Sequence, residues 1–114
     1  MADAARLNNV ASIVSETYRA GNDVVVVVSA QGDTTDDLIE KAAEINPSAS
    51  KREMDVLLSA GEQMSSSLLA MAIERMGLPV VSLMGWQLGM KTDSNHGTAH
   101  IKKVETDRLN AELA

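Results

Sequence analysis

Two short segments carry the side chains best suited to chemistry, and the first of them is SAQGDTTDD, residues 29–37. It follows five consecutive valines, Val24 to Val28, and combines hydroxyls and carboxylates with Gly32, which permits close approach to the backbone. Amides that open a following helix could face an anion. However, the segment matches no glycine-rich phosphate-binding pattern, and no Lys or Arg lies between Asn22 and Glu40. Local pattern alone therefore favours a turn and a capped helix over a ligand site.

The second segment, LLSAGEQMSSS, spans residues 57–67 and places Gly61 and Glu62 within an apolar helical stripe. A buried carboxylate at Glu62 would need a cationic or hydrogen-bonding partner, such as the ammonium group of a ligand. An exposed Glu62 would be an ordinary surface residue. Local pattern favours this second interpretation.

Asp93, His96 and His100 form a third cluster, but their spacing crosses a predicted turn at residues 92–97 and the start of a strand. This spacing matches no metal-binding signature, so we interpret the cluster as turn chemistry and expect no metal. Two histidines in one segment also provide no basis for a Ser-His-Asp triad. Trp86, the only tryptophan, is predicted to pack at a strand end, with stacking against a ligand as the less favoured alternative.

The elements that must position these residues include a buried strand. Val24 to Val28 cannot form a half-exposed strand, because successive side chains face opposite sides and all five are β-branched and apolar. Such a strand belongs inside a parallel sheet. Pro79 to Leu83 predicts a second buried strand, and Ala99 to Val104 a third. Ligands of open α/β sheets bind beyond the carboxyl ends of strands, which is where residues 29–37 lie.

Helical periodicity predicts five helices. They lie at Ala4 to Arg19, Thr34 or Thr35 to Ile45, Ser50 to the region of Gly61, from there to Gly77, and Thr106 to Ala114. The S-x-x-E pattern from Ser50 to Glu53 predicts a capping box. We expect a break at Ser59-Ala60-Gly61, because Gly costs about 1 kcal/mol relative to Ala inside a helix.

This element order predicts an α/β domain in which helices cover a largely parallel sheet, and 114 residues suit one domain. The sheet looks incomplete, because a strand apolar on both faces needs neighbours and the sequence offers only two or three strands. An open sheet edge tends to recruit another chain. We therefore expect either a homo-oligomer or a piece of a larger domain.

Composition excludes several classes of function. The net charge of −6 and the dispersed basic residues argue against nucleic acid or an anionic membrane as partner. The absence of Cys excludes disulfides, thiol catalysis and thiolate metal sites. No continuous apolar run approaches the roughly 20 residues that span a bilayer, and the first residues do not resemble a signal peptide. The expected location is the cytoplasm.

Three long segments together closely resemble aspartate kinases, members of the amino-acid kinase family. They read GNDVVVVVSAQGDTTDDLIEKA, REMDVLLSAGEQMSSSLLAMAIERMG and VVSLMGWQLGMKTDSNHGTAHI, in the family's order and spacing, and cover nearly the whole chain. The resemblance implies a three-layer α/β/α sandwich around a mostly parallel sheet. It also implies transfer of a phosphoryl group from ATP, with Mg²⁺, to the β-carboxylate of L-aspartate. The product, aspartyl phosphate, begins lysine, threonine and methionine biosynthesis.

The resemblance also assigns roles to individual residues. It implies that Ser29 lies at the nucleotide phosphates and that Glu62, in an S-x-G-E motif, pairs with the α-ammonium group of aspartate. A charge-assisted hydrogen bond from that cation would stabilise the Glu62 carboxylate. The implied substrate-binding loop comprises Asp33, Thr34, Thr35, Asp36 and Asp37.

The chain also departs from the family pattern. It lacks the opening K-F-G-G-T-S motif, whose lysine and glycines hold the phosphates, and the later segments that bind nucleotide and effectors. Phosphoryl transfer depends on positioning and charge stabilisation, so residues 1–114, as one partial amino-acid kinase domain, are expected to be inactive alone. The alternative is a non-catalytic interaction module that reuses the fold and pairs with a kinase subunit or with itself, through its sheet edge or helices.

Overall fold

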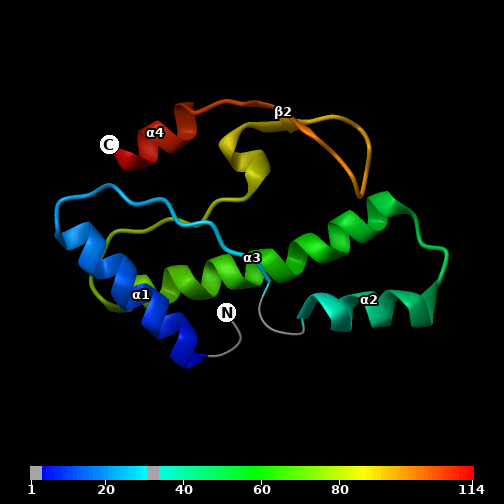
Figure 1. Ribbon diagram of the computed structural model, residues 1–114, viewed down its shortest axis with the longest axis horizontal. Coiled ribbons are helices and arrows are strands. Elements are labelled where there is room, and N and C mark those ends of the chain that lie inside the picture. The colour runs from blue at the N-terminus through cyan, green and yellow to red at the C-terminus, as the bar shows by residue number, and fades with distance from the viewer. Residues whose placement is uncertain (1–3, 31–33) are drawn as a thin grey trace.

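The computed structural model describes residues 4–30 and 34–114. Its elements are α1 (Ala4–Arg19), α2 (Thr34–Ile45), α3 (Lys51–Arg75), the 3₁₀ helix η1 (Gly85–Leu88), β1 (Met90–Thr92), β2 (Ile101–Val104) and α4 (Asp107–Leu113). Figure 1 shows α3 as a central rod, with α2 along one side and the β1–β2 hairpin and α4 on the other. The molecule is flat, at 49 × 34 × 14 Å, which is too thin for helices on both faces of a sheet.

Helix α3 is continuous, so the predicted break at residues 59–61 is wrong. The Ser50 Oγ caps its start by accepting a hydrogen bond from the Glu53 amide at 3.2 Å, which is one half of the predicted capping box. The Glu53 Oε1 accepts from the Arg52 Nη1 at 2.8 Å, so the N-cap is confirmed and the reciprocal bond of the box is not. Gly61 is buried within the helix, and close packing against its backbone offsets its poor helix propensity. By length and composition alone α3 could cross a membrane, but the core helix of a soluble protein passes the same test.

The core lies where α1 crosses α3 (Figure 1). Its buried apolar residues come in pairs four apart, one pair from each helix: Leu7 and Ala11, and Leu69 and Ile73. This spacing places each pair on one helix face, as the predicted periodicity requires. Arg19 adds a polar link, because its Nη2 donates to the Met76 carbonyl oxygen at 3.0 Å, at the C-terminal end of α3.

The two predicted buried strands are not formed in the described part of the chain. Residues 24–28 and 79–83 are extended but belong to no sheet. Val25, Val26 and Val27 are 56%, 39% and 93% exposed. The prediction of inner parallel strands is therefore wrong for this structure, because a strand needs ladder partners on both sides and no described residues supply them.

The sheet that does form is antiparallel and has two strands, β1 and β2. Strand β2 confirms a strand within the predicted range Ala99 to Val104, but it is exposed along its length, so its predicted burial is wrong. The turn predicted at residues 92–97 joins it to β1, which the sequence pattern missed. The α/β character is thus present, whereas the sheet formed among residues 4–30 and 34–114 is not parallel. Trp86 lies in η1 and is 76% exposed, so its predicted packing role is wrong here.

Candidate functional site

The first candidate segment leads directly into α2, and the start of α2 packs on the middle of α3. A Cβ added to Gly61 would lie 3.2 Å from the Thr34 Cγ2, 3.4 Å from the Ala30 Cβ and 3.6 Å from a Leu38 methyl carbon. Gly61 therefore lets this segment rest against the backbone of α3. Glu62 is the next residue of the helix, so the two candidate segments of the sequence meet at one place.

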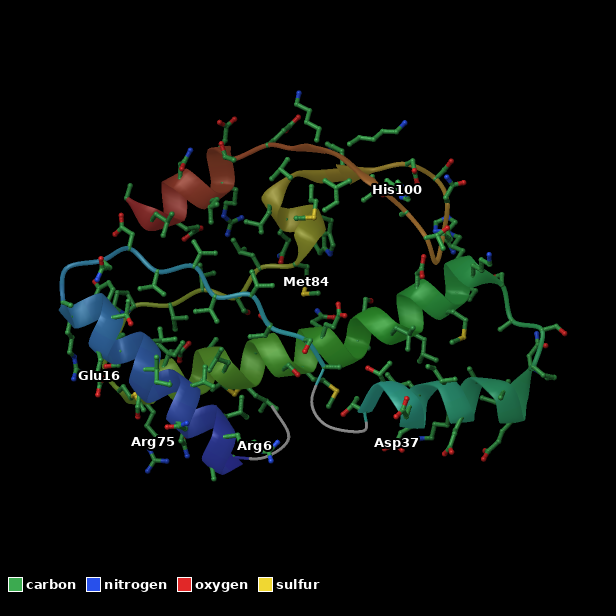
Figure 2. All side chains as sticks on the ribbon, in the orientation of Figure 1. Arg6, Glu16, Asp37, Arg75, Met84 and His100 are labelled. Atoms are coloured by element: carbon green, nitrogen blue, oxygen red, sulfur yellow. The ribbon has the colours of Figure 1, made fainter. Side chains whose placement is uncertain are left out.

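The predicted site residues occupy different positions around this contact. Thr34 and Thr35 are half-buried at the start of α2. Asp36 and Asp37 are exposed in its first turn, where the helix dipole favours carboxylates (Figure 2 shows Asp37 on this turn). Asp33 lies outside the described residues. The helix start and the carboxylates in its first turn are as the sequence predicts, and the cap of this helix and substrate binding by these residues stay predictions.

Ser29 and Glu62 are both exposed. Ser29 directly precedes Ala30, which lies at the contact with Gly61. Glu62 lies about 100° around α3 from Gly61, since a helix turns by that angle per residue. Its carboxylate is thus open to solvent beside the contact, as an ordinary surface residue or a ligand-binding group would be.

The chemistry available at this place is acidic and hydroxylic. Carboxylates accept hydrogen bonds from ammonium groups, and threonine hydroxyls donate to carboxylates. No Lys or Arg lies between Asn22 and Glu40. Residues 4–30 and 34–114 contain no group of three His, Cys, Asp or Glu that could hold a metal ion. The arrangement suits one end of a zwitterion better than it suits a phosphate chain.

The third cluster makes separate local contacts, which confirms the predicted turn chemistry. The Asp93 Oδ1 accepts a hydrogen bond from the Asn95 amide at 3.0 Å. The His100 Nδ1 lies 3.1 Å from the Thr98 carbonyl oxygen, and Figure 2 shows His100 on the opposite side of α3 from Asp37. Sequence reasoning missed Asp55, which contacts this turn from α3, because no local pattern signals a contact between residues 42 positions apart.

An open groove of about 550 Å³ lies beside the valine segment and residues 78–83, and reaches α4. Its walls are mostly apolar and include Val26, Leu69 and Leu109. None of the predicted site residues that the structure describes lines the groove. It resembles an uncovered core surface more than a binding site for a small polar ligand.

Gly61→Leu tests the contact between α2 and α3. We expect it to lower the free energy of unfolding by about 1–3 kcal/mol, since the added side chain has no space beside Thr34 and Ala30. Ala60→Leu is the matched control, because Ala60 is exposed on the same helix. Urea denaturation followed by circular dichroism measures both. Equal effects of the two substitutions would contradict the close packing at Gly61.

Comparison with known proteins gives consistent matches over this chain. The model of the amino acid kinase family matches residues 1–114. The chain is 51% identical over 113 residues to an aspartokinase of Mycolicibacterium smegmatis, covering 99% of the chain and 27% of that protein. It is 52% identical over 104 residues to an aspartokinase of Geobacillus stearothermophilus, covering 91% of the chain and 26% of that protein.

A solved structure also matches. The crystal structure of aspartate kinase from Synechocystis superposes with a TM-score of 0.70 at 46% identity, covering 73% of the chain and 14% of that protein. The chain therefore spans about a quarter of the length of the curated relatives it matches, and less of the structural one.

Proposed function

We propose that this chain, which belongs to the amino acid kinase family, is part of an aspartate kinase and carries part of its aspartate site. The observation that carries the proposal is the packing of Ala30 and Thr34 against Gly61, directly beside Glu62. The similarity to aspartokinases extends across both segments that meet there.

The aspartate end of the proposed site is built from acidic and hydroxyl groups. Glu62 accepts a charge-assisted hydrogen bond from the α-ammonium group of L-aspartate. The hydroxyls of Thr34 and Thr35 are suited to donate to a substrate carboxylate, and amides at the start of α2 favour the same anion. Asp33, Asp36 and Asp37 complete the proposed substrate-binding loop.

The ATP end is incomplete in these residues. Ser29 is the proposed contact to the nucleotide phosphates, but one hydroxyl does not neutralise a triphosphate, and no cation lies near it in sequence. The described residues therefore do not fit the whole of a Mg²⁺–ATP site. In the proposed enzyme, ATP with Mg²⁺ is held mainly by residues that these 114 do not include.

The complete domain is proposed to be a three-layer α/β/α sandwich with a mostly parallel sheet, of which residues 1–114 form part of one domain. The exposed Val25 and Val27 and the apolar groove beside them support this, because they are surfaces that neighbouring strands would cover. The cytoplasm is the proposed location, where ATP and aspartate are available. Nucleic acid and membranes are not proposed as partners, in keeping with the net charge of −6.

The purified 114-residue chain is expected to show no aspartate-dependent release of ADP in a coupled assay, since the phosphate cations are missing. The enzyme encoded by the complete reading frame is expected to show it. Turnover by the isolated chain would contradict this prediction, and a complete enzyme that phosphorylates another amino acid would contradict the proposed substrate.

The exposed valine segment, residues 24–28, also favours a second candidate function. In this case the chain is a non-catalytic module that pairs with another chain through this segment. The genomic reading frame distinguishes the two. A K-F-G-G-T-S sequence encoded in frame just upstream would support the kinase, whereas its absence would support the module. Light scattering after size exclusion would then show whether the module pairs with itself.

A further inference from the structure

The turn between β1 and β2 is held in shape by its own hydrogen bonds. The Asp93 amide donates to the His100 carbonyl oxygen at 3.0 Å, and the Thr98 amide donates to the Asn95 carbonyl oxygen at 3.1 Å. The Asn95 amide also donates to the Asp93 carboxylate at 3.0 Å. Residues 93–98, which we call the hairpin loop, therefore present a defined surface.

Asp55 fastens the hairpin loop to α3. Its Oδ2 accepts a hydrogen bond from the Gly97 amide at 2.8 Å and lies 3.5 Å from the His96 Nδ1. Gly97 has φ +83°, and a Cβ added there would lie 3.4 Å from the Lys51 Cδ. Figure 1 shows the hairpin reaching the N-terminal end of α3 at this point, while its strands lie farther from the helix.

Asp55 and Glu62 share one face of α3. They are seven residues apart, which corresponds to almost two full turns, about 10 Å along the axis and about 20° around it. Gly61, which contacts α2, lies on a different face. The hairpin loop is therefore fastened on the side of α3 that carries Glu62, and the start of α2 closes another side.

We propose that Asp55 is a positioning residue of the aspartate site, which holds the hairpin loop as a wall on the Glu62 side of α3. This inference rests on the proposed function. The loop is fastened about two helical turns from Glu62, and in this proposal it bounds that side of the space in which an ammonium group approaches Glu62 before aspartate binds. Without Asp55, the loop keeps its own hydrogen bonds but is no longer held against α3, so part of the binding energy of aspartate must position it. The contact of Asp55 with the hairpin loop therefore affects the affinity for aspartate and leaves the affinity for ATP unchanged.

Three variants of the complete enzyme test this. Asp55→Ala removes the acceptor and is expected to raise the KM for aspartate about fivefold to tenfold, the effect of losing a half-exposed hydrogen bond to a charged group. Asp55→Asn keeps an oxygen that accepts from the Gly97 amide and is expected to raise it about twofold. Glu74→Ala, at an exposed carboxylate on the same helix, is the control. The KM for ATP and kcat are expected to stay unchanged in all three.

Amide hydrogen exchange at Gly97 tests the contact between Asp55 and the hairpin loop independently of activity. Exchange is expected to be faster in Asp55→Ala than in Asp55→Asn, and unchanged in Glu74→Ala. An active aspartate kinase in which Asp55→Ala leaves the aspartate KM unchanged would overturn this inference alone. A complete enzyme without aspartate kinase activity would overturn the proposed function and this inference with it, whatever the exchange at Gly97.

Discussion

Glu62→Gln in the complete enzyme is expected to raise the KM for aspartate about 10- to 100-fold, with kcat and the KM for ATP changed less than about twofold. The substitution keeps the shape of the side chain but removes the charge that would attract the substrate ammonium group. A hydrogen bond to a charged group typically contributes about 1.5–3 kcal/mol, and each 1.4 kcal/mol corresponds to tenfold in affinity. Because Glu62 is exposed in this structure, we expect an effect toward the lower part of that range.

Steady-state kinetics with aspartate and ATP varied separately measure this. Glu74→Gln removes the same charge from an exposed position on the same helix and serves as the control. A rise in KM alone would indicate lost substrate binding, whereas a fall in kcat would indicate an interaction made in the transition state. Equal rises for ATP and aspartate would contradict the assignment of Glu62 to the aspartate ammonium group.

Leu69→Ala is expected to lower the free energy of unfolding of the 114-residue chain by about 2–5 kcal/mol. Leu69 is 3% exposed and packs where α1 crosses α3. The loss would be large for this chain, because only Leu7, Ala11 and Ile73 join it as buried apolar residues in the described part. Small domains are stabilised by only about 5–15 kcal/mol in total.

Met71→Ala is the matched control for Leu69→Ala. Met71 lies two residues away on the same helix but is 61% exposed, so its truncation is expected to change stability by less than about 1 kcal/mol. Urea denaturation followed by circular dichroism compares the two variants. If Met71→Ala costs as much as Leu69→Ala, the stabilising face of α3 is not the one that contacts α1.

The helices could be predicted from sequence because their hydrogen bonds join residues four apart. The patterns at residues 4–19 and 34–45 therefore gave the bounds that the structure has. The same local patterns gave a wrong prediction at Gly61. Its low helix propensity predicted a break in α3, whereas close packing against Thr34 and Ala30 requires a small residue there. A strand depends on partners elsewhere, and the apolar pattern of residues 24–28 could not reveal that no strand among the described residues pairs with them.

In the candidate site, too, local structure could be predicted from sequence and tertiary contacts could not. The pattern of Thr34, Asp36 and Asp37 indicated a helix start, which the structure contains, but only the family resemblance gave these residues a substrate. The meeting of Thr34 with Gly61 and of Asp55 with Gly97 depends on tertiary packing, which no local pattern encodes. The substrate-binding roles therefore stay predictions that the kinetic experiments must test.

The exposed valine segment has a consequence for how separate molecules of this chain behave together. Val27, 93% exposed, lies in an extended backbone with no sheet partner among the described residues. Exposed, extended segments rich in β-branched residues can pair between molecules and seed fibrils. The net charge of −6 opposes that stacking, because each molecule repels the next. Colloidal stability of the separated chain would therefore depend on salt, which screens the repulsion and leaves the apolar attraction in place.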